Sequence, residues 1–335
     1  MLPSFITKPV VYTALSGRIF ACGARCGHYT AAPAPRRFHK TQERNNTAMT
    51  EQQLSAAGFT PLPQIGGRAI LEEYQRGTNR ILDLCYGALD AYWDRPYCKQ
   101  ENGSLQIFVN EPEGYLALPP IGGDFHDGIA HLQKLFRAAG EPIYAGYFTA
   151  EQAQASCLAM DCDERFGDYI CKREELTALT WKYKHKTADY NAFLRTISPR
   201  AVPVSPAVFE DCRAVLSSWC ANRNCADCLF LCEKDVLERY LLHMEHNGMR
   251  GLLVYDGKMP IGLLLYYETP NMLFYPFCKT DKRYNGLSVW LYVEAARTCA
   301  SEYVNLGSDG GIAGLKRFKD KFRPYEKVNK FFTKL

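Results

Sequence analysis

The segment best suited to chemistry lies near the end of the chain, where glycines surround an aspartate. Residues 305–314 read NLGSDGGIAG, with four glycines within eight residues. Glycine lets a ligand approach the backbone closely, and a carboxylate near a cation can act as a base or hold an ammonium group. We therefore expect Asp309 to be a base or anchor, with Lys319 beside it. The alternatives are an Asx-turn residue and a solvated helix lysine. Within this segment, we expect the ligand to bind at Asn305, Gly307, Gly311 and Gly314.

A second candidate site lies in the loop that follows a predicted strand at 272–279. The loop places Arg283, Gly286 and Ser288 directly before a predicted helix at 287–299. Backbone N–H groups and the helix dipole favour an anion at such a helix start, and glycine gives a phosphate room. This spacing predicts a phosphate-binding loop, and the alternative is a plain strand-to-helix turn.

Two clusters have the residue types of metal ligands. Cys220, Cys225, Cys228 and Cys232 could hold zinc or an iron–sulfur centre, but only one C-x-x-C pair is present. If this segment is helical, three of the thiols share one face and act as buried apolar groups. Asp124, His126 and Asp127 could also bind a metal, although a loop with a helix cap explains them better. We therefore expect no metal site.

Composition indicates an ordinary globular protein with a local anionic partner. The chain has 335 residues, of which 47% are hydrophobic and 23% charged, and no apolar run is long enough to cross a membrane. Residues 313–335 carry eight Lys or Arg against two acidic residues, and residues 1–48 carry seven against one. The rest of the chain is acidic. This pattern favours one phosphate-bearing ligand over a DNA-binding surface.

The first residues and the cysteines bear on localisation. The 14 cysteines accompany no credible secretory signal, so we expect a reduced, cytoplasmic protein. Residues 1–48 are rich in arginine and poor in acidic residues, which is also typical of a mitochondrial transit peptide. A disordered extension or leader, with Met49 as the working start, is the favoured interpretation.

The predicted elements alternate helices with short strands, which indicates an α/β fold with mixed sheets. Residues 197–206 contain three prolines and are the expected boundary between two domains. We therefore divide the chain into an extension at 1–58, an N-terminal domain at 59–197 and a C-terminal domain at 198–335. A hairpin is expected to turn at Asp256-Gly257. The last strand is expected near 327–333.

Several motifs together resemble one protein family. The run GLKRFKDKFRP at 314–324 is similar to the near-terminal signature of the phosphatidylglycerol lysyltransferase C-terminal domain family, and NLGSDGG resembles the turn before it. Residues 166–170 (FGDYI), 181–186 (WKYKHK) and 191–193 (NAF) also fit, although Tyr190 stands where the family has arginine. The resemblance covers about residues 59–332 and implies two tandem domains of the GNAT acyltransferase fold. The loop at 283–288 resembles the GNAT pyrophosphate loop, with Ser288 where glycine or alanine is usual.

The resemblance implies a soluble aminoacyl transferase. Its donor would be aminoacyl-tRNA, and its acceptor an amine or hydroxyl of a small molecule, peptide or lipid headgroup. No metal or redox cofactor would be required, because the aminoacyl ester is already activated. Lys316, Arg317 and Lys319 would hold phosphates of the tRNA or of coenzyme A, with Lys184 and Lys186 as secondary contacts. The alternatives are an acyl-CoA-dependent N-acyltransferase and a non-catalytic ligand-binding protein of the same fold.

Overall fold

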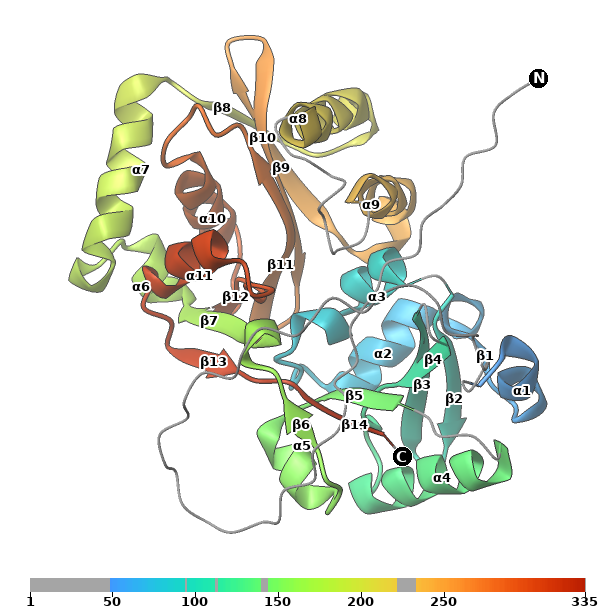
Figure 1. Cartoon of the computed structure of the whole chain (residues 1–335). Helices are drawn as coiled ribbons and strands as arrows, with labels where there is room; N and C mark the ends of the chain where they lie inside the picture. Colours follow the sequence, from blue (N-terminus) through green and yellow to red (C-terminus); the bar gives the residue numbers. More distant parts are fainter. Residues whose placement is uncertain (1–48, 94, 112–113, 140–143, 222–232, 335) are drawn as a thin grey trace, which may run out of the picture.

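Two mixed β-sheets form the framework of the computed structural model, which describes residues 49–93, 95–111, 114–139, 144–221 and 233–334. Each sheet has seven strands (Figure 1). The first sheet has the order β1 (Thr60–Pro61), β2 (Tyr97–Glu101), β3 (Ser104–Glu111), β4 (Gly114–Ala117), β5 (Tyr144–Phe148), β14 (Phe331–Lys334) and β6 (Asp161–Cys162). The second has the order β13 (Glu326–Val328), β7 (Asp168–Lys172), β12 (Tyr303–Asn305), β11 (Met272–Thr280), β10 (Met259–Glu268), β9 (Arg250–Asp256) and β8 (Arg200–Pro203). The expected α/β fold with mixed sheets is confirmed.

The two sheets exchange strands across the expected boundary at residue 198. β7 precedes that boundary but pairs with β12 and β13 in the second sheet. β14 ends the described chain but pairs with β5 and β6 in the first sheet. The sheets therefore do not divide at residue 198, and the domain division stays a prediction.

Helices cover the outer faces of both sheets. α10 and α7 pack on one face of the second sheet, and α8 and α9 lie on the other (Figure 1). The helices are α1 (Glu51–Ala56), α2 (Gly67–Gln75), α3 (Tyr86–Tyr92), α4 (Phe125–Ala139), α5 (Ala150–Ala155), α6 (Arg173–Thr177), α7 (Lys184–Thr196), α8 (Phe209–Ala221), α9 (Glu233–Asn247), α10 (Leu287–Arg297) and α11 (Ala313–Asp320). Short 3-10 turns lie at Leu62–Ile65, Leu82–Leu84, Glu164–Phe166, Trp181–Tyr183 and Pro206–Val208.

One hydrophobic core joins the two halves. Leu105 and Ile107 of β3 belong to the same buried cluster as Leu263 and Phe274 of the second sheet. A cluster of this kind resists separation of the halves, because opening it would return apolar surface to water. The relative position of the two sheets is thus fixed by packing.

Three local expectations differ from the structure. Thr78 and the apolar residues that follow it predict a helix from Thr78. The helix, α3, starts only at Tyr86, because the side chain of Asn79 accepts a hydrogen bond from the Ile81 N–H and closes a turn. The single strand expected at 327–333 is two strands, β13 and β14, in different sheets. Residues 49–58 of the expected extension fold, with Met49 and Leu54 buried. Residues 1–48 lie outside the described part of the chain.

Candidate functional site

The glycine-rich segment forms a tight bend between β12 and α11. Gly307, Gly310 and Gly311 have φ angles of 70°, 58° and 76°, which glycine adopts without strain. The Asn305 side chain accepts a 2.7 Å hydrogen bond from the Gly307 N–H, and Asp309 Oδ1 accepts a 2.8 Å bond from the Gly311 N–H. The sequence therefore folds here through two side-chain-to-backbone turns.

Asp309 is buried within this bend, with 2% of its surface exposed. Its Oδ2 accepts a 2.6 Å hydrogen bond from the hydroxyl of Tyr169, and Lys327 Nζ lies 3.7 Å away. Burial and then the bond to Asp309 raise the pKa of Tyr169, so its hydroxyl keeps its proton. Asp309 is thus a fixed carboxylate with a hydroxyl donor and a nearby cation. Its Oδ1 forms the Asx-turn bond, and its Oδ2 faces the Tyr169 hydroxyl and the Lys327 ammonium.

Lys319 points inward from α11 toward the same bend. Its Nζ donates to the carbonyl oxygens of Leu306 at 2.6 Å and Ser308 at 2.5 Å, and the residue is 4% exposed. Burial lowers the pKa of this ammonium to about 7. Lys319 therefore holds the bend in shape and is able to exchange a proton near neutral pH.

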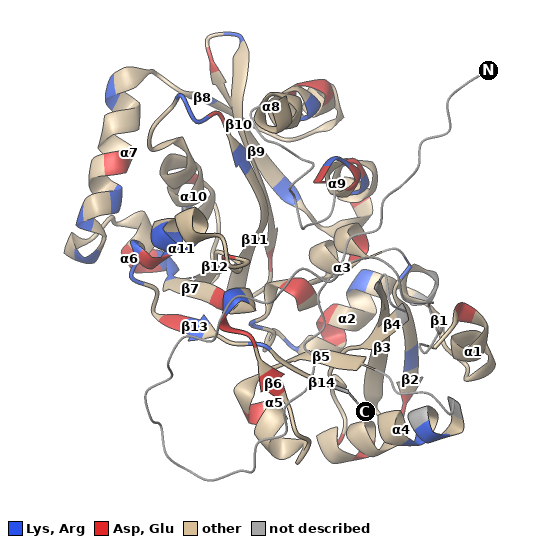
Figure 2. Ribbon diagram, in the orientation of Figure 1, with Lys and Arg blue, Asp and Glu red and all other residues tan. Residues whose placement is uncertain are grey.

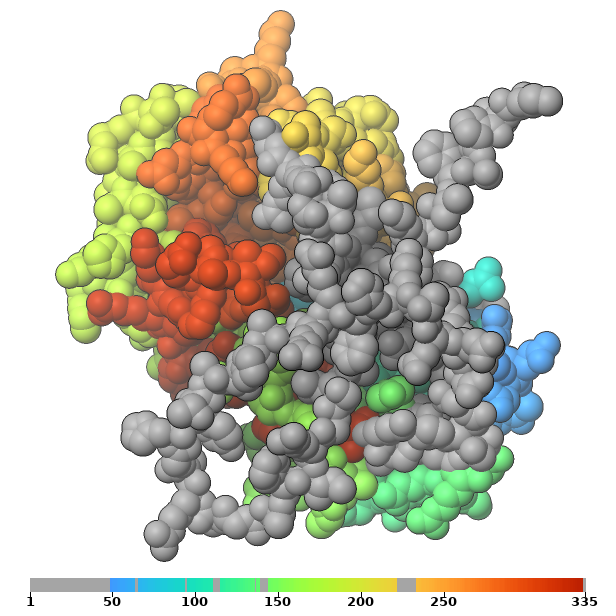
Figure 3. All heavy atoms as spheres, viewed as in Figure 1, coloured from blue at the N-terminus to red at the C-terminus, as the bar shows by residue number. Residues whose placement is uncertain are grey.

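The other predicted residues of α11 face outward. Lys316 is exposed and pairs with Asp320 at 2.7 Å, and Arg317 is exposed beside it. A side chain added at Gly314 would meet no atom within 4 Å, so the backbone there is open to a ligand. In Figure 3 the red surface of α11 is continuous with the yellow-green surface of α7.

A buried charge network lies directly behind the bend, and sequence reasoning missed it. Lys330, between β13 and β14, donates a 2.8 Å hydrogen bond to Asp168 and also bonds Asp83. Asp168 Oδ2 further accepts a bond from Asn305 at 3.0 Å, which links the network to the bend. Burial of the Lys330 ammonium disfavours its charge, but the two carboxylates outweigh burial and raise its pKa. The one available signal was Asp168 within the FGDYI motif.

The loop before α10 is shaped by α7. A side-chain carbon at Gly286, whose φ is 87°, would lie 2.0 Å from the backbone oxygen of Asp189. Arg283 is exposed and pairs with Asp281 at 2.6 Å, and Ser288 bonds Thr280 at 2.8 Å. The glycine thus accommodates α7. The structure does not bring Arg283, Gly286 and Ser288 together with Asp309 and Lys319 in any hydrogen bond or ion pair of the described residues.

Two lysines of α7 occupy different environments. Lys184 is exposed, whereas Lys186 is 1% exposed and its Nζ lies 3.8 Å and 4.4 Å from the ring centres of Phe318 and Phe322. Burial lowers the pKa of Lys186 to about 8. Tyr190 donates a 2.7 Å hydrogen bond to Glu294. α7 is therefore bound to α11 through cation–aromatic contacts and to α10 through Tyr190.

The metal candidates have ordinary explanations where the structure describes them. Asp124 Oδ1 accepts a 3.0 Å bond from the Asp127 N–H, so this loop caps α4 as expected. Cys225, Cys228 and Cys232 lie outside the described residues, while Cys220 lies in the last turn of α8. Across the described ranges, no group of three His, Cys, Asp or Glu side chains is placed to hold a metal ion.

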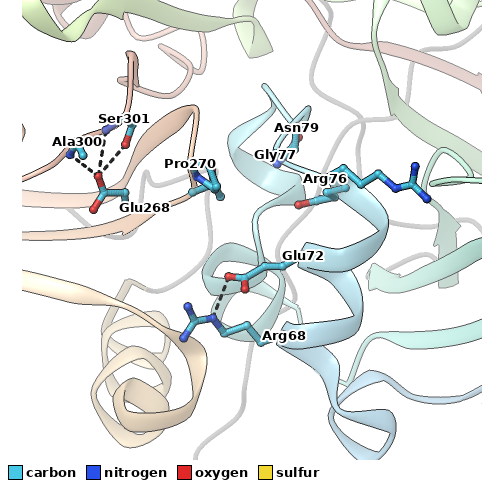
Figure 4. Close-up of a pocket in the computed structure, with 11 residues that line it drawn as sticks. Arg68, Glu72, Arg76, Gly77, Asn79, Glu268, Pro270, Ala300 and Ser301 are labelled. Atoms are coloured by element: carbon cyan, nitrogen blue, oxygen red, sulfur yellow. Dashed lines mark hydrogen bonds and ion pairs between the residues drawn. The ribbon is translucent and has the colours of Figure 1, made fainter.

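A separate pocket of about 540 Å³ lies between α2 and the turn joining β10 to β11 (Figure 4). Both acidic side chains of its wall have partners. Glu268 accepts bonds from Ala300 and Ser301, and Glu72 pairs with Arg68. The two carboxylates of this wall are thus already bonded within the chain. In the same described residues, no helix is long and apolar enough to span a membrane.

Comparison with known proteins agrees with this architecture. Residues 94–334 match the family described as "Phosphatidylglycerol lysyltransferase, C-terminal". No curated protein matches the chain. A conserved protein of unknown function from Bacteroides thetaiotaomicron has a similar structure, with a TM-score of 0.76 and 19% identity over 83% of this chain and 99% of that one.

Two further solved structures carry the family name. One is the C-terminal domain of a putative lysylphosphatidylglycerol synthetase from Agrobacterium fabrum, with a TM-score of 0.59, 13% identity, and coverage of 79% and 91%. The other is L-PGS from Bacillus licheniformis, with a TM-score of 0.57, 15% identity, and coverage of 79% and 90%. The expected resemblance to this family is confirmed. The chain belongs to the phosphatidylglycerol lysyltransferase C-terminal family.

Proposed function

We propose that this protein transfers an aminoacyl group from aminoacyl-tRNA to an amine or hydroxyl acceptor. The observation that carries the proposal is the double role of α11. From one short helix, Lys319 reaches the buried bend that holds Asp309, while Lys316 and Arg317 remain exposed. One side of the helix thus contacts a polar interior site, and its other side presents exposed cations to solvent. A donor with a small reactive ester on a large polyphosphate carrier fits that arrangement.

The exterior site extends beyond α11. The exposed cations Lys184, Lys316, Arg317, Lys321 and Arg323 together form what we call the basic surface. In Figure 2 the ribbon is blue, marking Lys and Arg, on α11 and on the adjoining end of α7. Only Lys316 of this set has an ion pair among the described residues. The excess of positive charge supports an anionic partner.

The chemistry needs positioning and proton transfer. The acceptor nitrogen or oxygen attacks the ester carbonyl, its bond to that carbon forms, and the bond to the ribose oxygen of the tRNA breaks. The acceptor loses a proton and the ribose oxygen gains one. Asp309 would take the acceptor's proton or hold the aminoacyl ammonium, with the Tyr169 hydroxyl orienting its carboxylate. Lys319 keeps the bend in place. The ester is already activated, so no cofactor is required for this step.

Coenzyme A is a less favourable donor for the loop before α10. The space beside Gly286 is filled by the Asp189 carbonyl of α7, whereas a pyrophosphate needs that approach to the backbone. Because any side chain at Gly286 would displace α7, Arg283→Glu is the sharper test. Coenzyme A binding that this variant abolishes would support the alternative acyl-CoA enzyme.

The direct test is discharge of aminoacylated tRNA. Purified protein is incubated with total tRNA charged with labelled amino acids and a cell extract as the source of acceptors, and both the loss of label from tRNA and the labelled product are measured. We expect Asp309→Asn to lower the rate at least tenfold and Lys258→Glu, at the exposed tip of the β9–β10 hairpin, to leave it unchanged. Binding of tRNA without discharge would favour a non-catalytic protein and contradict the proposal.

A further inference from the structure

Trp181 is the most exposed large apolar side chain that the structure describes. It is 82% exposed, whereas Trp93 and Trp290 are 5% and 7% exposed. Burying an indole ring is strongly favourable, so a surface position forgoes that stabilisation. The 3-10 turn that carries Trp181 is nonetheless well anchored. Tyr183 is buried against Phe322 with ring centres 6.5 Å apart, and Lys182 pairs with Glu175 at 2.8 Å.

The surroundings of Trp181 are cationic. The first turn of α7, which follows Trp181 directly, rests on α11 through Lys186 and the rings of Phe318 and Phe322. Burial lowers the pKa of Lys186, Asp189 at 3.8 Å from its Nζ raises it, and the charge of Lys321 lowers it, so Lys321 lies near this turn. Trp181 therefore adjoins the basic surface at the end formed by Lys184 and Lys321.

We propose that Trp181 is a stacking platform for an unpaired nucleotide of RNA whose phosphates lie on the basic surface. A flat aromatic ring beside lysine and arginine side chains is the arrangement by which proteins bind single-stranded nucleic acid. The inference rests on the proposed function and goes further, because it names the part of the tRNA that is recognised. That part is the single-stranded end next to the aminoacyl ester, and the paired stem does not provide such a base.

A membrane surface fits Trp181 less well. Stable attachment of a folded protein to a bilayer interface needs a broad apolar face. Among the described residues, the other exposed large apolar side chains lie on separate elements: Leu194 at the far end of α7, Leu242 on α9, Met259 on the β9–β10 hairpin, Ile312 before α11 and Tyr325 before β13. One indole at the end of a basic surface is matched to a base and its phosphates.

The test uses the full chain and two RNA hairpins at one fixed salt concentration. One hairpin carries a four-nucleotide single-stranded 3′ end, and the other is blunt. We expect the first hairpin to quench tryptophan fluorescence, since Trp181 is the highly exposed indole. Trp181→Ala should weaken binding of that hairpin about five- to a hundredfold and leave the blunt hairpin unaffected. Trp181→Phe should restore part of the affinity, because phenylalanine also stacks.

Leu242→Ala is the matched control, since it removes an exposed apolar side chain on another helix. It should change neither affinity. Equal loss for both hairpins in Trp181→Ala, or no quenching, would overturn the inference. A blue shift with anionic vesicles and none of the RNA effects would assign Trp181 to a membrane surface and overturn it as well. If quenching and the Trp181→Ala loss are found but no aminoacyl transfer, the proposed function fails and the stacking site stands. If transfer occurs and Trp181→Ala alters neither binding nor rate, only the stacking inference fails.

Discussion

The two sheets contain the same crossover, but the segments that follow the crossover differ. In the first sheet, β4 leads through α4 to β5, which is parallel to it. In the second, β11 leads through α10 to the parallel β12. β5 is followed by α5, which Thr149 caps through a capping box. β12 is followed by the glycine bend that buries Asp309 and receives Lys319. Shared topology therefore does not imply shared chemistry.

The loops before the two crossover helices differ in charge. Asp124 and Asp127 lie at the start of α4, where the Asp124 carboxylate caps the helix. Lys282 and Arg283 lie before α10. An acidic helix start repels phosphate and a basic one attracts it. The first loop is thus suited to structural support. The second is basic, although Arg283 is paired with Asp281 and α7 fills the space beside Gly286.

The largest expected effect follows from breaking the link between the halves at Lys330. Lys330→Met leaves Asp83 and Asp168 as buried carboxylates without their cation, so we expect the free energy of unfolding to fall by about 3–5 kcal/mol. Urea unfolding measures it. Lys258→Met removes an exposed lysine and should change the free energy of unfolding little. Adding Asp83→Asn to Lys330→Met should recover part of the loss. A loss below about 1 kcal/mol would show that the network does not stabilise the junction.

The second prediction concerns the bend itself. Because of Lys319, the free energy of unfolding should depend on pH. Folded Lys319 has a pKa of about 7, whereas an unfolded lysine titrates near 10.4. Above pH 7 the unfolded chain binds this proton and the folded chain does not, so stability rises with pH. We expect a contribution of up to about 1.4 kcal/mol per pH unit from this residue between pH 7 and 8.5.

Urea unfolding across that range measures the slope, and Lys319→Met should reduce it. A residual slope from Lys186 should remain near pH 8, because its pKa is also lowered. Lys316→Met, an exposed change on the same helix, should leave the slope intact. Above pH 8.5 the buried cysteines act in the opposite direction, since burial raises the pKa of Cys85 and Cys98 to about 12. An unchanged slope in Lys319→Met would contradict the lowered pKa of Lys319.

The sequence predicted the elements with clear periodicity and short-range turn signals. The sequence of residues 233–247 predicts a helix, and α9 has the same bounds. The hairpin turns at Asp256-Gly257 as expected. α2 was missed, because two glycines precede its apolar residues and weaken the helix pattern. The terminal strand was misjudged for a tertiary reason. Lys330 must turn inward to meet Asp168, and this contact divides one extended segment between two sheets.

In the candidate site, too, contacts within one motif were predictable and contacts between distant segments were not. Asp309 and Lys319 lie ten positions apart within one motif, so their proximity was visible in the sequence. Tyr169 and Asp309 are 140 positions apart, and Lys330 and Asp168 are 162 apart. No local pattern reports such contacts, because they depend on how the two sheets are joined. The exposed position of Trp181 is equally invisible to residue spacing.

The third prediction sharpens the contrast between the acidic and basic loops. Asp124→Ala removes the cap of α4 and should lower the free energy of unfolding by about 1 kcal/mol. It should leave the affinity for the single-stranded RNA hairpin unchanged, because the first crossover does not hold the donor. His126→Ala, at an exposed position in the first turn of α4, is the control. A rise in the unfolding midpoint on adding Zn²⁺, lost in Asp124→Ala, would show instead that this loop binds a metal.

The smallest expected effect distinguishes two reasons for a glycine at position 314. Gly314 lies in the first turn of α11 with open space around it, so Gly314→Ala should stabilise the helix by up to about 1 kcal/mol. If the donor's phosphate approaches the backbone there, the added methyl group should weaken RNA binding a few-fold while stability rises. Lys234→Ala on the exposed face of α9 controls for surface alanines. Opposite changes in stability and affinity can arise only when a glycine is retained for a ligand. A gain in stability with unchanged affinity would remove Gly314 from the donor site and leave the bend at Asp309 as the feature that separates the two crossovers.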